Sequence, residues 1–357
     1  MKQMFKSLTE LAQTIEAQTA GKADLVVPAS VLHMTDNAAL NVAEAPSREV
    51  THLGHRQIAE YTGIPAAYYD KLRGVDRPLL AHNVNGWLGR KGNERRMVRT
   101  LDGNVRALLS DRYQRIDNHE VADVALSVLS KVPGIRVVSS AITESRMYIK
   151  AVSEAVQATV PGSRRVGDIV EAGIMVRNSE VGLGSVSIQP FANFLVCLNG
   201  MVRDKSGMRA AHVGRRIDLD IEGLLTDQTR RLEDEVVLRK VRDVIAHAFD
   251  KGAFTKFIDQ LGATTQQRIE GDVSAAVEAL GPTLGLLQGE RSSVLRHLIE
   301  GSDLSRYGLM NAITRTAEDV ESYDRATEIE TIGYRMIELP QRDWSAISNA
   351  KPLKLAA

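Results

Sequence analysis

Arginine and lysine side chains gather in one short stretch of a chain whose overall charge is balanced. The 357 residues carry 45 Lys and Arg and 45 Asp and Glu, which gives a formal net charge of +0 at pH 7. Within residues 89–115, only Glu94, Asp102 and Asp111 oppose a larger basic set: Arg90, Lys91, Arg95, Arg96, Arg99, Arg106, Arg112 and Arg115. Guanidinium and ammonium groups bind phosphate oxygens, so this stretch points to contact with a polyanion such as a nucleic-acid backbone.

The dipeptide Asp102-Gly103 separates two runs of alternating residues, which is the strongest short signal for a two-residue β-hairpin. Such a turn pairs residue 101 with 104, 99 with 106 and 97 with 108. Arg99 would then face Arg106 on one side of the sheet, and like charges directly opposite one another are destabilising. The pattern therefore requires a compensating group, which is either a bound anion or a carboxylate.

Alternation continues downstream and predicts further antiparallel strands. RMYIKAV (146–152) places Arg146, Tyr148 and Lys150 on one face, and VEAGIMVRNSEVGLGSVSIQ (170–189) adds Arg177 to a polar face. In PFANFLVCLNGM (190–201) the apolar spacing predicts a helix that covers the apolar side of the sheet. We therefore expect an α+β fold with a central curved antiparallel sheet, in which one helix covers one face and the other face is basic and uncovered.

A second basic cluster follows the expected covering helix, and with the first cluster it would form a groove along the uncovered face. Tyr113 and Tyr148 could serve as platforms on which bases stack. The residues predicted to contact nucleic acid are Arg95, Arg99, Arg106, Arg112, Tyr113, Arg146, Tyr148, Lys150, Arg177, Arg203, Lys205, Arg215 and Arg216. The alternative is a solvated sheet face whose arginines pair with carboxylates of the helical region.

Around this sheet the pattern is helical. We expect an N-terminal arm over 1–50, a helical lead-in over 51–92, the sheet with its covering helix and basic loop over 93–217, and a helical C-terminal region over 218–357. Cys197 is the single cysteine, which excludes an intramolecular disulfide and multi-cysteine metal sites. No long apolar run or signal sequence is present, so we expect a cytoplasmic protein that has no membrane partner.

Other chemistries find weaker support. The chain lacks a phosphate-binding loop, a nucleophile elbow and the HExxH motif, so we expect no cofactor, no metal and no catalytic residues. His52 and His55, and the polar group formed by Asp117, His119, Glu120 and Asp123, are incomplete as metal sites. Asp117 or Asn118 is better placed to cap a helix. HRQIAEYTGIPAAYYDKL (55–72) has the small residue and the turn glycine of a helix-turn-helix, although its second helix offers few base-reading side chains.

Several ordered motifs resemble one family. NVNGWL (83–88), LLSDRYQRIDN (108–118), VRNSEVGLGSVSIQPF (176–191), VCLNGM (196–201) and YGLMNAITRTAED (307–319) are similar to the phage/plasmid-like proteins of unknown function. That resemblance implies a mobile-element context, in which DNA metabolism is a natural role. The expected architecture also resembles the core of the Rad/RecT/Red-beta single-strand annealing proteins, which work without ATP as oligomeric rings or filaments.

These observations lead to one principal hypothesis and two alternatives. The principal hypothesis is a non-enzymatic, homo-oligomeric protein that binds single-stranded DNA along a basic sheet face and anneals complementary strands without a cofactor. The first alternative is a duplex-DNA regulator that acts through the helix-turn-helix pattern. The second is an oligomeric protein-interaction module that does not bind nucleic acid.

Overall fold

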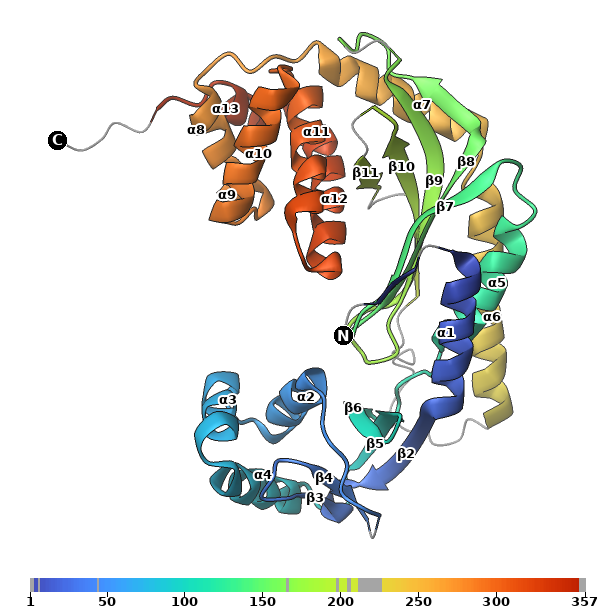
Figure 1. The fold of residues 1–357 in the computed structure, drawn as a ribbon, viewed down its shortest axis with the longest axis vertical. Helices are drawn as coiled ribbons and strands as arrows, with labels where there is room; N and C mark the ends of the chain where they lie inside the picture. The colour runs from blue at the N-terminus through green and yellow to red at the C-terminus, as the bar shows by residue number, and fades with distance from the viewer. Residues whose placement is uncertain are drawn as a thin grey trace, which may run out of the picture.

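The computed structural model describes residues 3–5, 7–43, 45–164, 167–196, 199–203, 207–210 and 227–352. About half of the chain is helical and a quarter is strand, and the strands are antiparallel, as expected for an α+β protein. The chain is shaped like a crescent, with α2–α4 at one end and α8–α13 at the other (Figure 1). Two separate sheets connect these ends, and the first fifty residues contribute a strand to each of them.

The smaller sheet belongs to the N-terminal end and has the strand order β2-β5-β6. Its strands are β2 (Lys22–Pro28), β5 (Arg95–Leu101) and β6 (Asn104–Ser110), and its neighbours are η1 (Ala29–Val31), β3 (Leu32–Met34) and β4 (Leu40–Val42). Three helices complete this end: α2 (His52–Thr62), α3 (Ala66–Val75) and α4 (Arg77–Lys91). Their apolar residues share one core with the sheet, in which Ile58 and Leu80 pack with Val98 and Val105.

Local sequence chemistry sets the limits of these helices. Thr51 caps α2 by accepting a hydrogen bond from the Gly54 amide at 3.2 Å, and Asp76 caps α4 by accepting one from the Leu79 amide at 3.0 Å. Helix α2 ends at Gly63, whose φ of 74° lies in the left-handed region that glycine adopts without strain. The start and the end of α2 and the start of α4 therefore follow directly from the residue types.

The larger sheet has the strand order β1-β7-β8-β9-β10-β11, and β12 also pairs with β10. Its strands are β1 (Gln3–Phe5), β7 (Ile135–Ile142), β8 (Met147–Thr159), β9 (Ile169–Asn178), β10 (Val186–Phe194), β11 (Asn199–Val202) and β12 (Met208–Ala210). Helices α1 (Leu8–Gly21), α5 (Asn118–Leu129) and α6 (Asp227–His247) cover one face of this sheet, along the outer side of the crescent (Figure 1). There Leu11 and Val241 pack against Ile149, Ile174 and Ile188.

The C-terminal helices form the largest core of the protein and cover part of the larger sheet on both of its faces. They are α7 (Lys251–Thr265), α8 (Val273–Glu278), α9 (Leu280–Leu284), α10 (Gln288–Gly301), α11 (Arg306–Thr316), η3 (Ala317–Asp319), α12 (Tyr323–Glu338) and α13 (Gln341–Ser348). Tyr323 of α12 packs on the sheet beside Tyr148 and Phe191. In the described part of the chain, no helix is both long enough and apolar enough to cross a bilayer.

The covering helix expected over residues 190–201 does not exist. Residues through Phe194 belong to β10, and Asn199–Val202 form β11, which pairs with β10 in the register Phe191↔Val202. Both faces of β10 are buried, and Phe191 lies on the face that otherwise carries Ser187, Gln189 and Asn193, so the alternation is interrupted where the expected helix began. Helices from the two ends of the chain cover the sheet instead.

The expected hairpin is present, but its register and its sheet differ from the prediction. Leu101 pairs with Asn104 and Thr100 with Val105, and then a bulge shifts the register so that Arg99 faces Ala107. Arg106 is the extra residue of this bulge and therefore does not lie opposite Arg99. The hairpin pairs with β2 rather than with the strands that follow it, so the single continuous sheet that we expected is two sheets.

Candidate functional site

Residues 179–185, which connect β9 to β10, form a junction loop that receives hydrogen bonds from the smaller sheet and its helices. Arg99 Nη1 donates to the Glu180 carbonyl at 2.8 Å, and Arg106 Nη1 donates to Glu180 Oε2 at 2.7 Å. Gln57 of α2 donates from Nε2 to the Val181 carbonyl at 2.7 Å. The loop therefore ties the N-terminal end to the larger sheet.

The larger sheet holds the same loop from the other side. Arg146 Nη2 donates to the Leu183 carbonyl at 2.5 Å, and Ser179 Oγ donates to the Ser145 carbonyl at 2.8 Å. Tyr113 adds a hydrogen bond from its hydroxyl to the Ser179 carbonyl at 2.8 Å. Four residues from the predicted set, namely Arg99, Arg106, Tyr113 and Arg146, thus converge on one loop of the NSEVGLG motif.

Carboxylates compensate the two hairpin arginines. Arg99 is fully buried and donates to Asp24 Oδ1 at 3.0 Å and to Asp117 Oδ1 at 2.6 Å. Lys22 Nζ lies 2.5 Å from Glu180 Oε1, and Arg106 holds the other oxygen of the same carboxylate. Three cations and three carboxylates therefore balance in one buried network. Arg99 was predicted to contact a phosphate group. It is instead buried between Asp24 and Asp117, where a nucleic-acid strand cannot reach it.

The network controls the protonation of its members. Burial acts to raise the pKa of Glu180, but the charges of Arg106 and Lys22 outweigh it and lower that pKa to about 2. Burial likewise acts to lower the pKa of Arg99, whereas Asp117 and Asp24 raise it overall. Glu180 and Arg99 are therefore both charged at neutral pH, and the junction is an ionic clamp.

Asp117 has a second role, as the N-cap of α5. Glu120 Oε2 accepts a hydrogen bond from the Asp117 amide at 2.8 Å, which completes a capping box. The capping function expected for this polar group is confirmed. Among the described residues, no group of three or more His, Cys, Asp or Glu side chains is arranged to hold a metal ion.

The sheet face that was expected to be basic and uncovered is packed against α12. Tyr148 donates to Asp324 Oδ1 at 2.6 Å, and Lys150 Nζ lies 2.5 Å from Glu330 Oε2. Tyr148 is 1% exposed and Lys150 is 3% exposed, so neither can stack on a base or contact phosphate in this state. Carboxylates of the C-terminal helical region therefore pair with this face, as the alternative expected, but the face is buried and not solvated.

The remaining predicted residues are dispersed. Arg177 lies half-buried between Tyr148 and Ser187 in neighbouring strands, and Arg203 stacks on Phe257 at 4.5 Å from the ring centroid. Arg95 and Arg112 are exposed at the end of the hairpin that lies away from its turn. Lys205, Arg215 and Arg216 lie outside the described residues.

The outer end of the smaller sheet carries a surface on which cations and aromatic rings meet. Arg90 lies over the Trp87 ring at 4.6 Å from its centroid, and Lys91 and Arg96 lie over the Tyr61 ring at 5.0 and 4.0 Å. We call Tyr61, Trp87, Arg90, Lys91, Arg95 and Arg96 the basic–aromatic surface. The basic residues of this surface stand out in the sequence, whereas Tyr61 and Trp87 were not predicted to belong to it, although the i,i+3 spacing of Trp87 and Arg90 on a helix was a usable signal.

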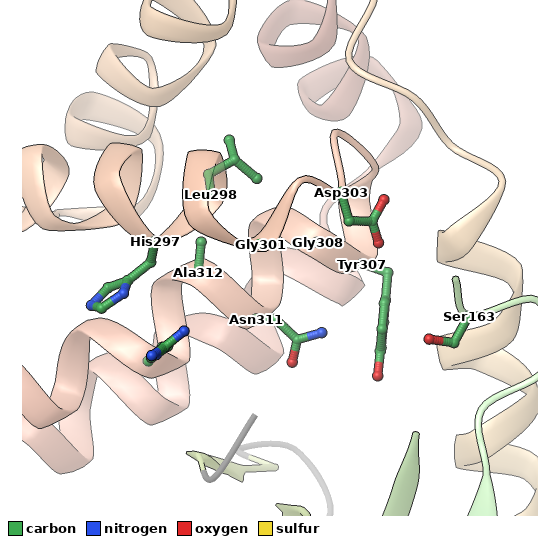
Figure 2. Close-up of a pocket in the computed structure, with 10 residues that line it drawn as sticks. Ser163, His297, Leu298, Gly301, Asp303, Tyr307, Gly308, Asn311 and Ala312 are labelled. Atoms are coloured by element: carbon green, nitrogen blue, oxygen red, sulfur yellow. The ribbon is translucent and has the colours of Figure 1, made fainter. Parts of the chain in front are cut away.

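A large cleft of about 970 Å³ separates the two sheets at the turn end of the hairpin. Its walls are one face of α1, the start of α2, the β5–β6 turn, the β7–β8 turn and the junction loop. A second pocket, between α10 and α11, holds only about 20 Å³, which is room for about one water molecule. Figure 2 shows Ser163 beside Tyr307 at this pocket. Both hydroxyls donate to Asp168 Oδ2.

Comparisons of the chain with models of protein families, with curated proteins and with solved structures gave no match.

Proposed function

We propose that the protein binds single-stranded nucleic acid at its basic–aromatic surface. The observation that carries this proposal is the stack of Arg90 on Trp87, a residue that is 43% exposed. An exposed indole offers a face on which any base can stack, and the adjacent guanidinium contributes a phosphate contact. The same two elements, stacking and charge, occur in proteins that bind single strands without sequence preference.

Local charge supports the same conclusion. Arg90, Lys91 and Arg95 are exposed, and Glu94 is the only acid between residues 90 and 96. The surface is therefore cationic although the whole chain is neutral. Arg112 follows Ser110, which pairs with Arg96, so this exposed arginine extends the charge at the same end of the sheet. Each phosphate contact releases counterions, so binding should weaken steeply with salt.

Fluorescence anisotropy of a labelled oligothymidylate across a salt series tests the proposal. We expect the wild type to bind with a linear loss of log affinity against log salt. Replacing Arg90, Lys91 and Arg95 together by glutamine should lower the slope by about 2, because each phosphate contact on a single strand contributes about 0.7.

The matched control replaces Arg239, Lys240 and Arg242 of α6, which are exposed and have the same residue types. This control should bind like the wild type. No binding by the wild type, or an equal loss in both triple variants, would contradict the proposal. Annealing of complementary strands and assembly into rings or filaments stay predictions, and the same variants serve to measure them.

A duplex-binding helix-turn-helix is the second candidate. The observation in its favour is that α3 is exposed along the side away from its buried Tyr69 and Leu72, so the helix is free to enter a groove. A hydrogen bond of 2.8 Å between His55 Nδ1 and the Tyr69 hydroxyl fixes α3 on α2. Tighter binding of a duplex than of a single strand, abolished by Tyr68→Ala, would favour this candidate.

A further inference from the structure

The cleft between the two sheets contains the guanidinium groups of two arginines that the junction loop holds in place. Arg106 is anchored by Glu180, and Arg146 is anchored by the Leu183 carbonyl, as described above. Both side chains line the cleft, together with residues of α1, α2 and the β7–β8 turn. The cleft lies at the opposite end of the hairpin from the basic–aromatic surface, so it is a separate site.

Both arginines keep buried N–H groups that no acceptor of the described chain satisfies. These groups are Nε and Nη2 of Arg106 and Nε of Arg146. Their side chains are only 11% and 22% exposed. A buried donor without an acceptor is costly, and each such group in a native protein calls for an explanation. Because both side chains line the cleft, an acceptor bound there would satisfy these buried groups once the guanidinium groups turn toward it.

The charges around the cleft limit the size and the charge of the acceptor that can bind there. Glu180 is already paired with Lys22 and Arg106, and Glu144 Oε1 accepts a hydrogen bond from the Leu53 amide at 2.9 Å, in the first turn of α2. Glu10 and Asp102 add two more carboxylates to the lining. These acids would repel a polyphosphate, so the two arginines can accommodate only one small anionic group.

The rest of the wall mixes uncharged polar groups with the apolar side chains of Ala17, Leu101, Ile142 and Val181. Gln13, Thr14 and Gln18 present amide and hydroxyl groups along one face of α1, and Thr143 and Ser145 add hydroxyls from the β7–β8 turn. A volume of about 970 Å³ is at the upper end of the range for small-molecule sites. We propose that the cleft binds a small molecule with one oxyanion group, held by Arg106 and Arg146, and a neutral body that carries both hydrogen-bonding and apolar groups.

Thermal unfolding in phosphate, in acetate and in chloride at equal pH and ionic strength tests the oxyanion subsite directly. The wild type should show a midpoint that rises with oxyanion concentration and saturates, since binding to the folded state stabilises it. Saturation matters because phosphate also stabilises proteins in general by exclusion from their surface. Whether phosphate or acetate gives the saturable rise identifies the oxyanion.

Two variants and one control complete the test. Arg106→Lys keeps a cation beside Glu180 but removes the unpaired donors, and Arg146→Gln removes the second guanidinium. Each should weaken apparent oxyanion affinity about tenfold, as expected for loss of a charge-assisted hydrogen bond. Arg239→Gln, at an arginine 70% exposed on α6, should behave like the wild type. If the Arg106→Lys variant does not fold, the oxyanion affinity of the Arg146→Gln variant alone tests the proposal. No saturable rise, or the same rise in every variant, overturns the proposal.

Discussion

Replacing Glu180 by glutamine removes the carboxylate that joins the two sheets. The pKa of Glu180 is about 2 in the folded protein, against an ordinary value of 4.5 that we take for the unfolded chain. This difference corresponds to about 3 kcal/mol of stability. Because the pKa is lowered on folding, the contribution is complete well above pH 4.5 and is lost as the pH falls through about 2. The variant also leaves Lys22 and Arg106 without their partner, so we expect a loss of about 3–5 kcal/mol at neutral pH.

Urea unfolding followed by circular dichroism, repeated from about pH 6 to about pH 3, measures both effects. The gap in unfolding free energy between the wild type and Glu180→Gln should narrow by about 2 kcal/mol over this range, since Glu180 of the unfolded wild type takes up a proton while that of the folded protein stays ionised. Glu154→Gln is the control, because this carboxylate is 63% exposed and should change stability by less than about 0.5 kcal/mol. A Glu180→Gln protein as stable as the wild type, or a gap independent of pH, would refute the ionic clamp.

Two further substitutions test the packing around the sheets. Lys150→Met should destabilise by about 3–5 kcal/mol because it leaves Glu330 buried and unpaired, whereas adding Glu330→Leu should recover most of that loss, as measured by urea unfolding of both variants. Gly182→Ala should cost more than about 1 kcal/mol, because φ is +78° and the added Cβ would lie 2.6 Å from Leu109. Gly289→Ala, on α10 with open space around it, should be neutral or stabilising in the same assay.

Local chemistry was sufficient to predict several elements from the sequence. The Asp102-Gly103 turn, the cap of α5 at Asp117 and the end of α2 at Gly63 each depend on residues within a few positions of one another. Like charges on opposite strands are destabilising, and this rule correctly predicted that the arginines of the hairpin need a compensating partner. These predictions hold since neither turn chemistry nor capping needs tertiary information.

The errors have a common physical cause, which is that contacts distant in sequence decided the outcome. Glu180 is 74 positions from Arg106 and Glu330 is 180 positions from Lys150, and no local pattern indicates either pair. The bulge at Arg106 changes the register without a glycine or proline to mark it. Burial of β10 on both faces gave a pattern that also fits a helix. The sequence therefore located the basic residues but not the carboxylates that neutralise them.

The most direct test of the proposed function follows the fluorescence of Trp87 during titration with single-stranded DNA. The chain has two tryptophans, and Trp344 is 3% exposed, so Trp344→Phe leaves Trp87 as the single indole reporter. Stacking of a base on the exposed ring should quench this fluorescence to saturation, and added salt should reverse the quenching. Binding that is visible by anisotropy while Trp87 fluorescence stays constant would contradict the basic–aromatic surface as the nucleic-acid site.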